Sequence, residues 1–81
     1  MKSVTIFYKV FGCNDEGKPI LYAEFLDFKE ACQYAVSKHG KIHYGLPEVE
    51  KHIYTYDTES KSVAHNFEKI EPAQIHYMNK I

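Results

Sequence analysis

The sequence predicts an α+β fold of two layers, in which an antiparallel sheet of about four strands carries one helix on one face. Three observations predict it. Segments in both halves of the chain have strand patterns, a central segment has the apolar spacing of a helix, and turn formers separate them. The expected order is strand, strand, helix, strand, strand. A chain of 81 residues makes one domain, which we expect to span residues 1–71, with residues 72–81 as a tail or short helix.

The first two strands are expected over about residues 3–11 and 19–26, joined by a loop rich in turn formers. Pro19 suits the first residue of a strand, because it cannot donate to the ladder. The expected register pairs Val10 with Ile20 and Tyr8 with Tyr22, so that cross-strand apolar and aromatic side chains stabilise the hairpin.

The opening strand is apolar on both faces. One face carries Val4, Ile6, Tyr8 and Val10, and the other carries Phe7 and Phe11. A single covering helix buries one sheet face, so the second face requires a partner, a second copy of the chain or a ligand. In the expected register Glu24 shares the face of Ile6 and Tyr8, and we interpret that face as the outward one, with Glu24 as a polar group at an interface.

The helix is expected to begin after Asp27, which is a good N-cap with Glu30 three residues later. One face is apolar and built mostly from small residues: Phe28, Ala31, Cys32, Ala35, Val36 and His39. Gly40 is expected to end the helix as a left-handed residue. A narrow face of small side chains suits close packing of the helix on the sheet.

Residues 41–44 are expected to be a short extended piece, and the third and fourth strands to span about residues 48–56 and 62–70. Two registers are open for this hairpin. If Tyr56 pairs with Lys61, His52 faces His65 directly, whereas pairing Asp57 with Lys61 separates the two histidines. After Pro72 the chain is expected to form a short helix with Ile75 and Met78 on one side, or a flexible arm.

Composition excludes several functional classes. The ten basic and eleven acidic residues leave a net charge of −1, which is not the electrostatic footprint of a general nucleic-acid binder. Two cysteines are too few for a disulfide framework, and we expect both to be reduced. The first residues do not resemble a signal peptide and no apolar run is long enough to span a membrane, so we expect a cytoplasmic protein.

No arrangement of residues indicates catalysis, and we expect neither an enzyme nor a cofactor. Cys32 lies on the apolar helix face and Cys13 has no histidine near it in the sequence, so neither has the base that a nucleophile requires. His52 and His65 could contribute two ligands to a metal ion, but the spacing supplies no third or fourth, and no metal site is assigned.

The aromatic content is the unusual feature, with seven tyrosines, five phenylalanines and no tryptophan. Aromatic side chains give large contact areas at little entropic cost. We therefore expect a small non-enzymatic binding protein that contacts a protein partner, or its own copy, through an aromatic-rich sheet face or a strand edge. The expected contact residues are Phe7, Tyr8, Phe11, Tyr22, Glu24, His52, Tyr54 and Tyr56.

Two alternatives remain open at this point. The first is a single-stranded nucleic-acid-binding module that uses the aromatic rings, although the chain has no arginine. The second is a small metal-binding protein that uses His52 and His65. The strand and helix order is similar in outline to small accessory proteins of bacteria and phages, including inhibitors of host defence complexes, which implies a regulator or inhibitor. A homodimer through the first hairpin would cover that hairpin's apolar surface.

Overall fold

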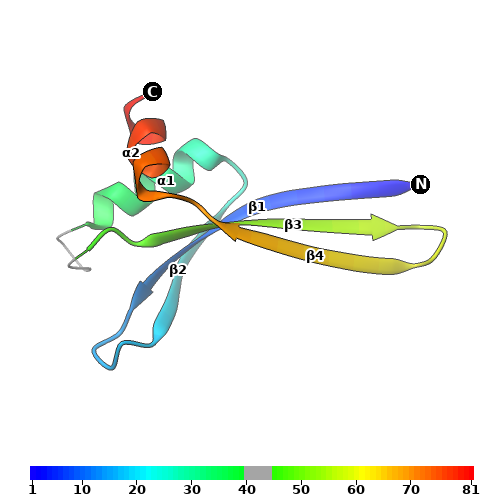
Figure 1. Ribbon diagram of the computed structural model, residues 1–81, viewed down its shortest axis with the longest axis horizontal. Helices are drawn as coiled ribbons and strands as arrows, with labels where there is room; N and C mark the ends of the chain where they lie inside the picture. The colour runs from blue at the N-terminus through cyan, green and yellow to red at the C-terminus, as the bar shows by residue number, and fades with distance from the viewer. Residues whose placement is uncertain (40–44) are drawn as a thin grey trace.

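The computed structural model describes residues 1–39 and 45–81. Its elements are β1 (Lys2–Cys13), β2 (Pro19–Phe25), α1 (Phe28–Lys38), β3 (Glu48–Asp57), β4 (Ser62–Lys69) and α2 (Pro72–Lys80). The four strands of this described part form one antiparallel sheet in the order β2-β1-β3-β4 (Figure 1). The predicted α+β class is confirmed, whereas the expectations for Gly40 and residues 41–44 fall outside the described residues.

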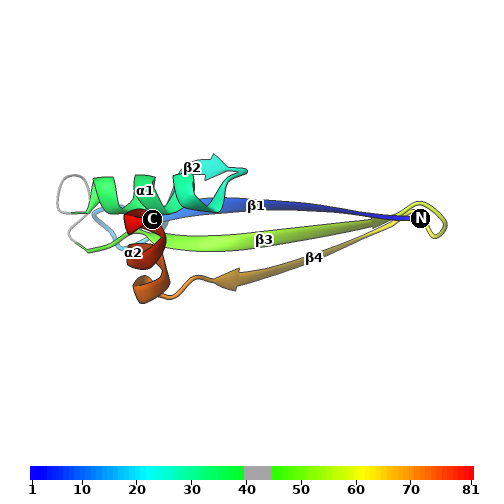
Figure 2. The same cartoon turned by 90° about the horizontal axis from the view of Figure 1, so that it is seen from above.

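The molecule is long and thin, with principal extents of 47 × 33 × 16 Å. Both helices lie over one end of the sheet, and β1, β3 and β4 continue beyond them as an uncovered extension (Figures 1 and 2). We call this extension the ribbon and define it as residues 2–7 of β1, 52–57 of β3 and 62–67 of β4. The face of the sheet on which the helices pack is the helix face, and the opposite face is the open face.

Helix α1 begins where the sequence predicts. The Asp27 side chain accepts a hydrogen bond from the Lys29 amide at 3.1 Å and so caps the first turn. The small side chains of Ala31, Cys32 and Ala35 are fully buried against the sheet. Small residues allow the helix axis to approach the strands closely, as predicted.

Helix α2 makes the end of the chain part of the fold. It starts at Pro72, which occupies the first turn where the missing amide costs nothing. Ile75 is 1% exposed and joins a core that includes Val10 and Val49, and Met78 packs at its edge. Helix α2 also packs against α1. Of the two alternatives for this segment, the short helix is therefore correct.

The register of the first hairpin differs from the prediction. Val10 pairs with Ala23 rather than with Ile20, and the register shifts between Val10 and Phe11, leaving Tyr22 as the extra residue of a bulge. Gly12 makes this possible, because a Cβ atom at that position would overlap the Tyr22 ring. As a result β2 pairs only with the second half of β1, from Tyr8 onward.

Both registers considered for the second hairpin are also wrong. Asp57 pairs with Ser62, and the connection is a four-residue turn from Thr58 to Lys61. Lys61 has φ of 53°, the left-handed conformation that closes such turns and that a lysine rarely adopts. The observed register differs by two residues from the first alternative, so the same side chains share a face but meet different neighbours.

Candidate functional site: an aromatic and histidine surface on the ribbon

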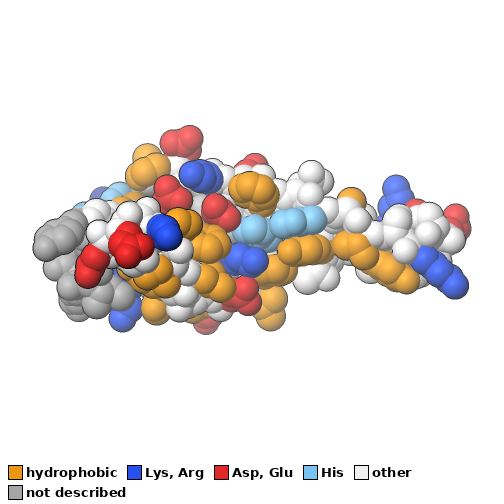
Figure 3. All heavy atoms as spheres, turned by 90° about the horizontal axis from the view of Figure 1, so that it is seen from below, with side chains coloured by type: hydrophobic (Ala, Val, Ile, Leu, Met, Phe, Trp, Pro, Cys, Tyr) orange, Lys and Arg blue, Asp and Glu red, His pale blue; other side chains and the backbone are white. Residues whose placement is uncertain are grey.

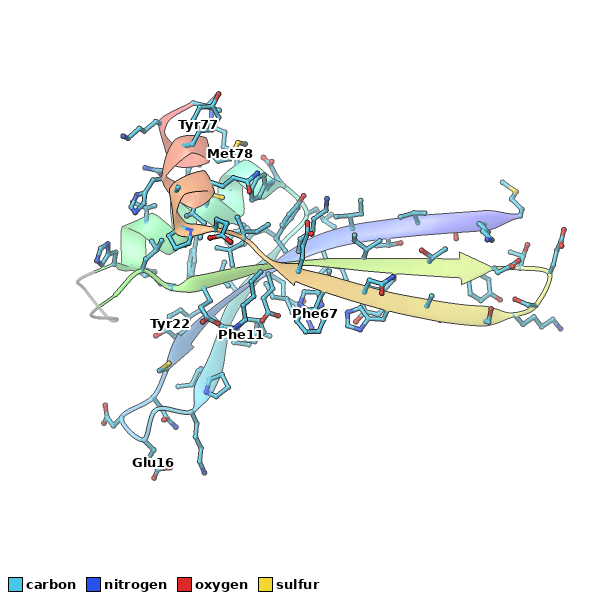
Figure 4. All side chains as sticks on the ribbon, in the orientation of Figure 1. Phe11, Glu16, Tyr22, Phe67, Tyr77 and Met78 are labelled. Atoms are coloured by element: carbon cyan, nitrogen blue, oxygen red, sulfur yellow. The ribbon has the colours of Figure 1, made fainter. Side chains whose placement is uncertain are left out.

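The candidate site is the open face of the ribbon. Alternation along the paired strands places one set of side chains on this face: Phe7, His52, Tyr54, Tyr56, Val63, His65 and Phe67. Figure 4 shows Phe67 on the side of the ribbon away from Tyr77 and Met78 of α2. In Figure 3, which views the molecule from below, the histidines lie among hydrophobic side chains along the ribbon.

The rings of this face form one continuous cluster across three strands. Tyr54 and His65 face each other in register, and their rings stack with centroids 4.2 Å apart and planes 4° apart. Phe7 stacks on Tyr54 at 5.4 Å, and His52 stacks on Phe67 at 5.4 Å. Contacts of this kind between cross-strand neighbours hold side chains in fixed orientations. The surface is therefore organised before anything binds it.

A hydrogen-bonded chain runs through the same cluster. The Glu50 carboxylate accepts from Nε2 of His52 at 2.9 Å, and Nδ1 of His52 lies 2.8 Å from Nε2 of His65. When both imidazoles are neutral, His65 donates to His52; when His52 is protonated, it donates to His65 instead. His52 is 5% exposed, so these bonds satisfy a buried polar ring.

The cationic side chains of the open face are matched by carboxylates. Lys9 lies 3.9 Å from Glu24, and Lys69 lies 3.6 Å from Glu48. Lys9 also lies over the Phe7 ring, 5.5 Å from its centroid. Because both ion pairs are local and their signs cancel, this face carries no concentrated positive charge that would attract a phosphate backbone.

Large apolar side chains on this face remain open to solvent. Val63 is 63% exposed, Phe67 is 58% exposed and Tyr56 is 41% exposed. Apolar groups that gather on one face, instead of being scattered singly over a surface, are typical of interaction sites. The partly buried rings of Phe7 and Tyr54 lie between them.

The residues expected from the sequence fall into two groups. Phe7, Phe11, Glu24, His52, Tyr54 and Tyr56 lie on the open face. Tyr8 and Tyr22 instead pack against the core, where Tyr8 stacks on Phe28 of α1 at 5.0 Å. The interpretation of the Tyr8 side as the outward one is therefore wrong, and Glu24 lies on the opposite side because it pairs with Lys9.

Sequence reasoning missed part of the surface on β4, because it named His65 only as a possible metal ligand and did not name Val63 or Phe67 as contact residues. Val63, His65 and Phe67 alternate along that strand and so share a face in any register. That alternation could have identified them as a group. What the sequence did not supply was the register that sets them beside Tyr54 and His52.

Metal binding and cysteine reactivity can be examined in the described residues. Within residues 1–39 and 45–81, no group of three His, Cys, Asp or Glu side chains is placed to hold a metal ion. The facing nitrogens of His52 and His65 are at hydrogen-bond distance, which is too short for a zinc ion between them. Burial, with a smaller contribution from Asp27, raises the pKa of the Cys32 thiol from 9.0 to about 11, so this group stays protonated and unreactive near neutral pH.

Comparisons of the chain with models of protein families, with curated proteins and with solved structures found no match in any of the three. Over the part of the chain that the structure describes, no helix has both the length and the apolar character needed to cross a membrane.

Proposed function

We propose that the chain is a small non-enzymatic binding protein that holds a protein partner through the open face of its ribbon. The observation that carries this proposal is the ring cluster: an exposed, apolar and pre-ordered surface on the side of the sheet opposite to both helices. Such a protein acts by occupying a surface of its partner, as a regulator or inhibitor does.

The partner that this surface fits is an apolar protein surface with a few polar groups and little net charge. Phe67, Val63 and Tyr56 supply apolar and aromatic area, and aromatic anchors carry much of the binding energy at protein interfaces. The imidazole of His65 supplies a polar group at the centre, and the balanced ion pairs of Lys9 and Lys69 supply a polar rim.

Two observations favour a protein over a single-stranded nucleic acid. A base stacks on an open ring face, whereas Tyr54 and His65 already cover one face of each other. The lysines of this surface are paired with carboxylates, so the counterion release that drives nucleic-acid binding is small.

The test is quantitative co-purification from the native host with the full chain as bait. Phe67→Asp places a charge in the exposed apolar centre, and we expect at least a tenfold loss of the captured partner, about 1.4 kcal/mol or more. Tyr77→Asp is the matched control, because Tyr77 is a similarly exposed aromatic residue on α2 (65%).

Capture that survives Phe67→Asp and is lost with Tyr77→Asp would move the contact to the helices. Salt-dependent retention of a labelled oligonucleotide by the wild-type chain, lost with Phe67→Asp, would replace the protein partner by a nucleic acid. Both variants must retain the far-ultraviolet circular dichroism of the wild type.

A further inference from the structure

The first half of β1 has an open backbone edge. Strand β2 pairs with β1 only from Tyr8 to Cys13, so within the described residues no strand lies beside residues 2–7 on that side. The amide of Thr58 donates to the carbonyl of Met1, which shows that the odd-numbered residues here direct their backbone groups toward β3. The alternate residues Lys2, Val4 and Ile6 therefore direct their N–H and C=O groups outward.

The edge of β1 at residues 2–7 has few of the features that prevent exposed strands from pairing with other chains. The edge at β2 has such features, because β2 is short and begins with Pro19. On β4 the charged residues Glu68 and Lys69 lie beyond the ribbon, and residues 62–67 carry no Lys, Asp or Glu. Along residues 2–7 the only charged side chain is Lys2, while Val4 is 59% exposed and Ile6 is 39% exposed. An unprotected, apolar edge favours pairing with another strand.

We propose that this edge pairs with the same edge of a second copy, so that β1 lies antiparallel to β1 of the partner around a two-fold axis at Val4. In this register Val4 faces its own counterpart and Lys2 faces Ile6 of the other chain, so every outward backbone group finds a partner. No two like charges stand directly opposite each other, and the chain's net charge of −1 opposes association only weakly.

The length of the open edge selects a copy of the same segment. Pairing by β2 begins at Tyr8, and Leu26 follows Phe25 directly, so the open edge of β1 is a notch that accommodates residues 2–6 of a second strand. The segment that enters it is followed in its own chain by a β1–β2 hairpin, which would collide with any longer overlap. The β1 strand of each copy therefore occupies the open edge of the other. The shared ladder ends at β2 of one copy on one side and at β2 of the other copy on the other side.

A shallow surface pocket lies where this register places Met1 of the second copy. It measures about 330 Å³ and is lined by Phe7, Glu24, Phe25 and Leu26. Met1 of the second copy would leave the shared ladder at this point, next to Phe7 and Leu26. Met1 and Leu26 are 86% and 80% exposed, more than the other large hydrophobic residues of the described chain. Pairing brings them together, and the flexible methionine side chain suits an irregular, shallow pocket.

The oligomeric state tests the proposal, because sedimentation distinguishes the 9.5 kDa chain from a species of twice that mass. We expect the wild type to be a dimer and Val4→Pro to be a monomer with unchanged circular dichroism. Proline at this position removes an amide that points away from β3, so the ladder with β3 is kept. Thr5→Pro is the contrasting variant, because it removes an amide that faces β3 and should lower stability.

A charge pair tests the register itself. Val4→Lys and Val4→Asp should each be monomeric, since like charges would meet across the axis, and an equimolar mixture of the two should recover the dimer. A wild-type chain that stays monomeric at about 1 mM would overturn the proposal. A dimer that persists in both charge variants separately would place the interface elsewhere.

Discussion

Val10 and Val4 lie on the same face of the same strand, yet Val10 is fully buried and Val4 is 59% exposed. Between them the sheet passes out from under the helices (Figure 2). The apolar alternation of β1 is the same on both sides of this boundary. The difference teaches that an apolar strand pattern indicates a face that can be buried, but does not say whether it is buried. Burial depends on how far along the sheet the helices extend.

The two regions also differ in how they hold their side chains. At the covered end, Val10, Val49 and Ile75 meet across the helix–sheet interface. In the ribbon, His52 and Tyr54 are held by rings on neighbouring strands. Core packing therefore stabilises one region, and contacts between cross-strand neighbours organise the other.

The largest expected effect is on core packing. Val10→Ala should lower the free energy of unfolding by about 2.5 kcal/mol, because it removes buried methyl groups and leaves a cavity. Val4→Ala is the same change six positions earlier on the same face, and should cost less than about 0.5 kcal/mol in dilute protein. Urea unfolding of both variants checks the prediction. Equal losses would mean that the ribbon is as well covered as the core.

The next effect concerns the close approach at the bulge. Gly12→Ala should destabilise the protein by about 2 kcal/mol, because the added methyl group overlaps the Tyr22 ring. The same change made in a Tyr22→Ala background should cost much less, and a double-mutant cycle measured by urea unfolding reports the difference. Additive effects of the two substitutions would show that the ring does not lie over Gly12.

A smaller effect is expected within the ribbon. His65→Ala removes the ring stacked on Tyr54 and the hydrogen-bonding partner of His52, and should cost about 1 kcal/mol. His76→Ala is the control, because His76 is an exposed histidine on α2 and should shift stability by no more than about 0.5 kcal/mol. Indistinguishable unfolding curves for these two variants would contradict an ordered ring cluster.

At neutral pH the smallest effect is expected from the buried ionisable groups of the covered end, because their contribution to stability changes only in alkaline solution. Burial raises the pKa of Cys32 from 9.0 to about 11, and burial also raises the pKa of Tyr8. In this range the unfolded chain loses these protons before the folded chain does, so stability is complete below pH 9 and falls between about pH 9 and 11. Thermal unfolding across this range should show the decline, and Cys32→Ala should reduce it. A stability that rises with pH over this range would contradict the prediction.

The elements themselves could be predicted because their causes are local. The cap at Asp27, the small residues that follow it and the proline that opens α2 each act within a few positions. These features predicted the fold class and the first helix, and they made the second helix one of two alternatives for residues 72–81. The strand boundaries followed from the turn formers between them.

The registers could not be predicted, because they depend on interactions that local patterns do not express. The first hairpin shifts because Gly12 leaves space for the Tyr22 ring. The second hairpin has a different register because Lys61 takes a left-handed conformation, which cannot be predicted from a lysine side chain. His52 and Tyr54 were identified as site residues, but the partners that complete the surface depended on the register of β4.

Residue-resolved amide hydrogen exchange of the free protein, measured over a range of protein concentrations, tests most directly whether the chain leaves its ribbon uncovered. We expect the amides of Val4 and Ile6 to exchange rapidly in dilute protein and to become protected as the second copy binds, while the amide of Thr5, which faces β3, is protected throughout. Full protection of Val4 and Ile6 at the lowest concentration would show that the chain covers this edge by itself, and would contradict the open ribbon.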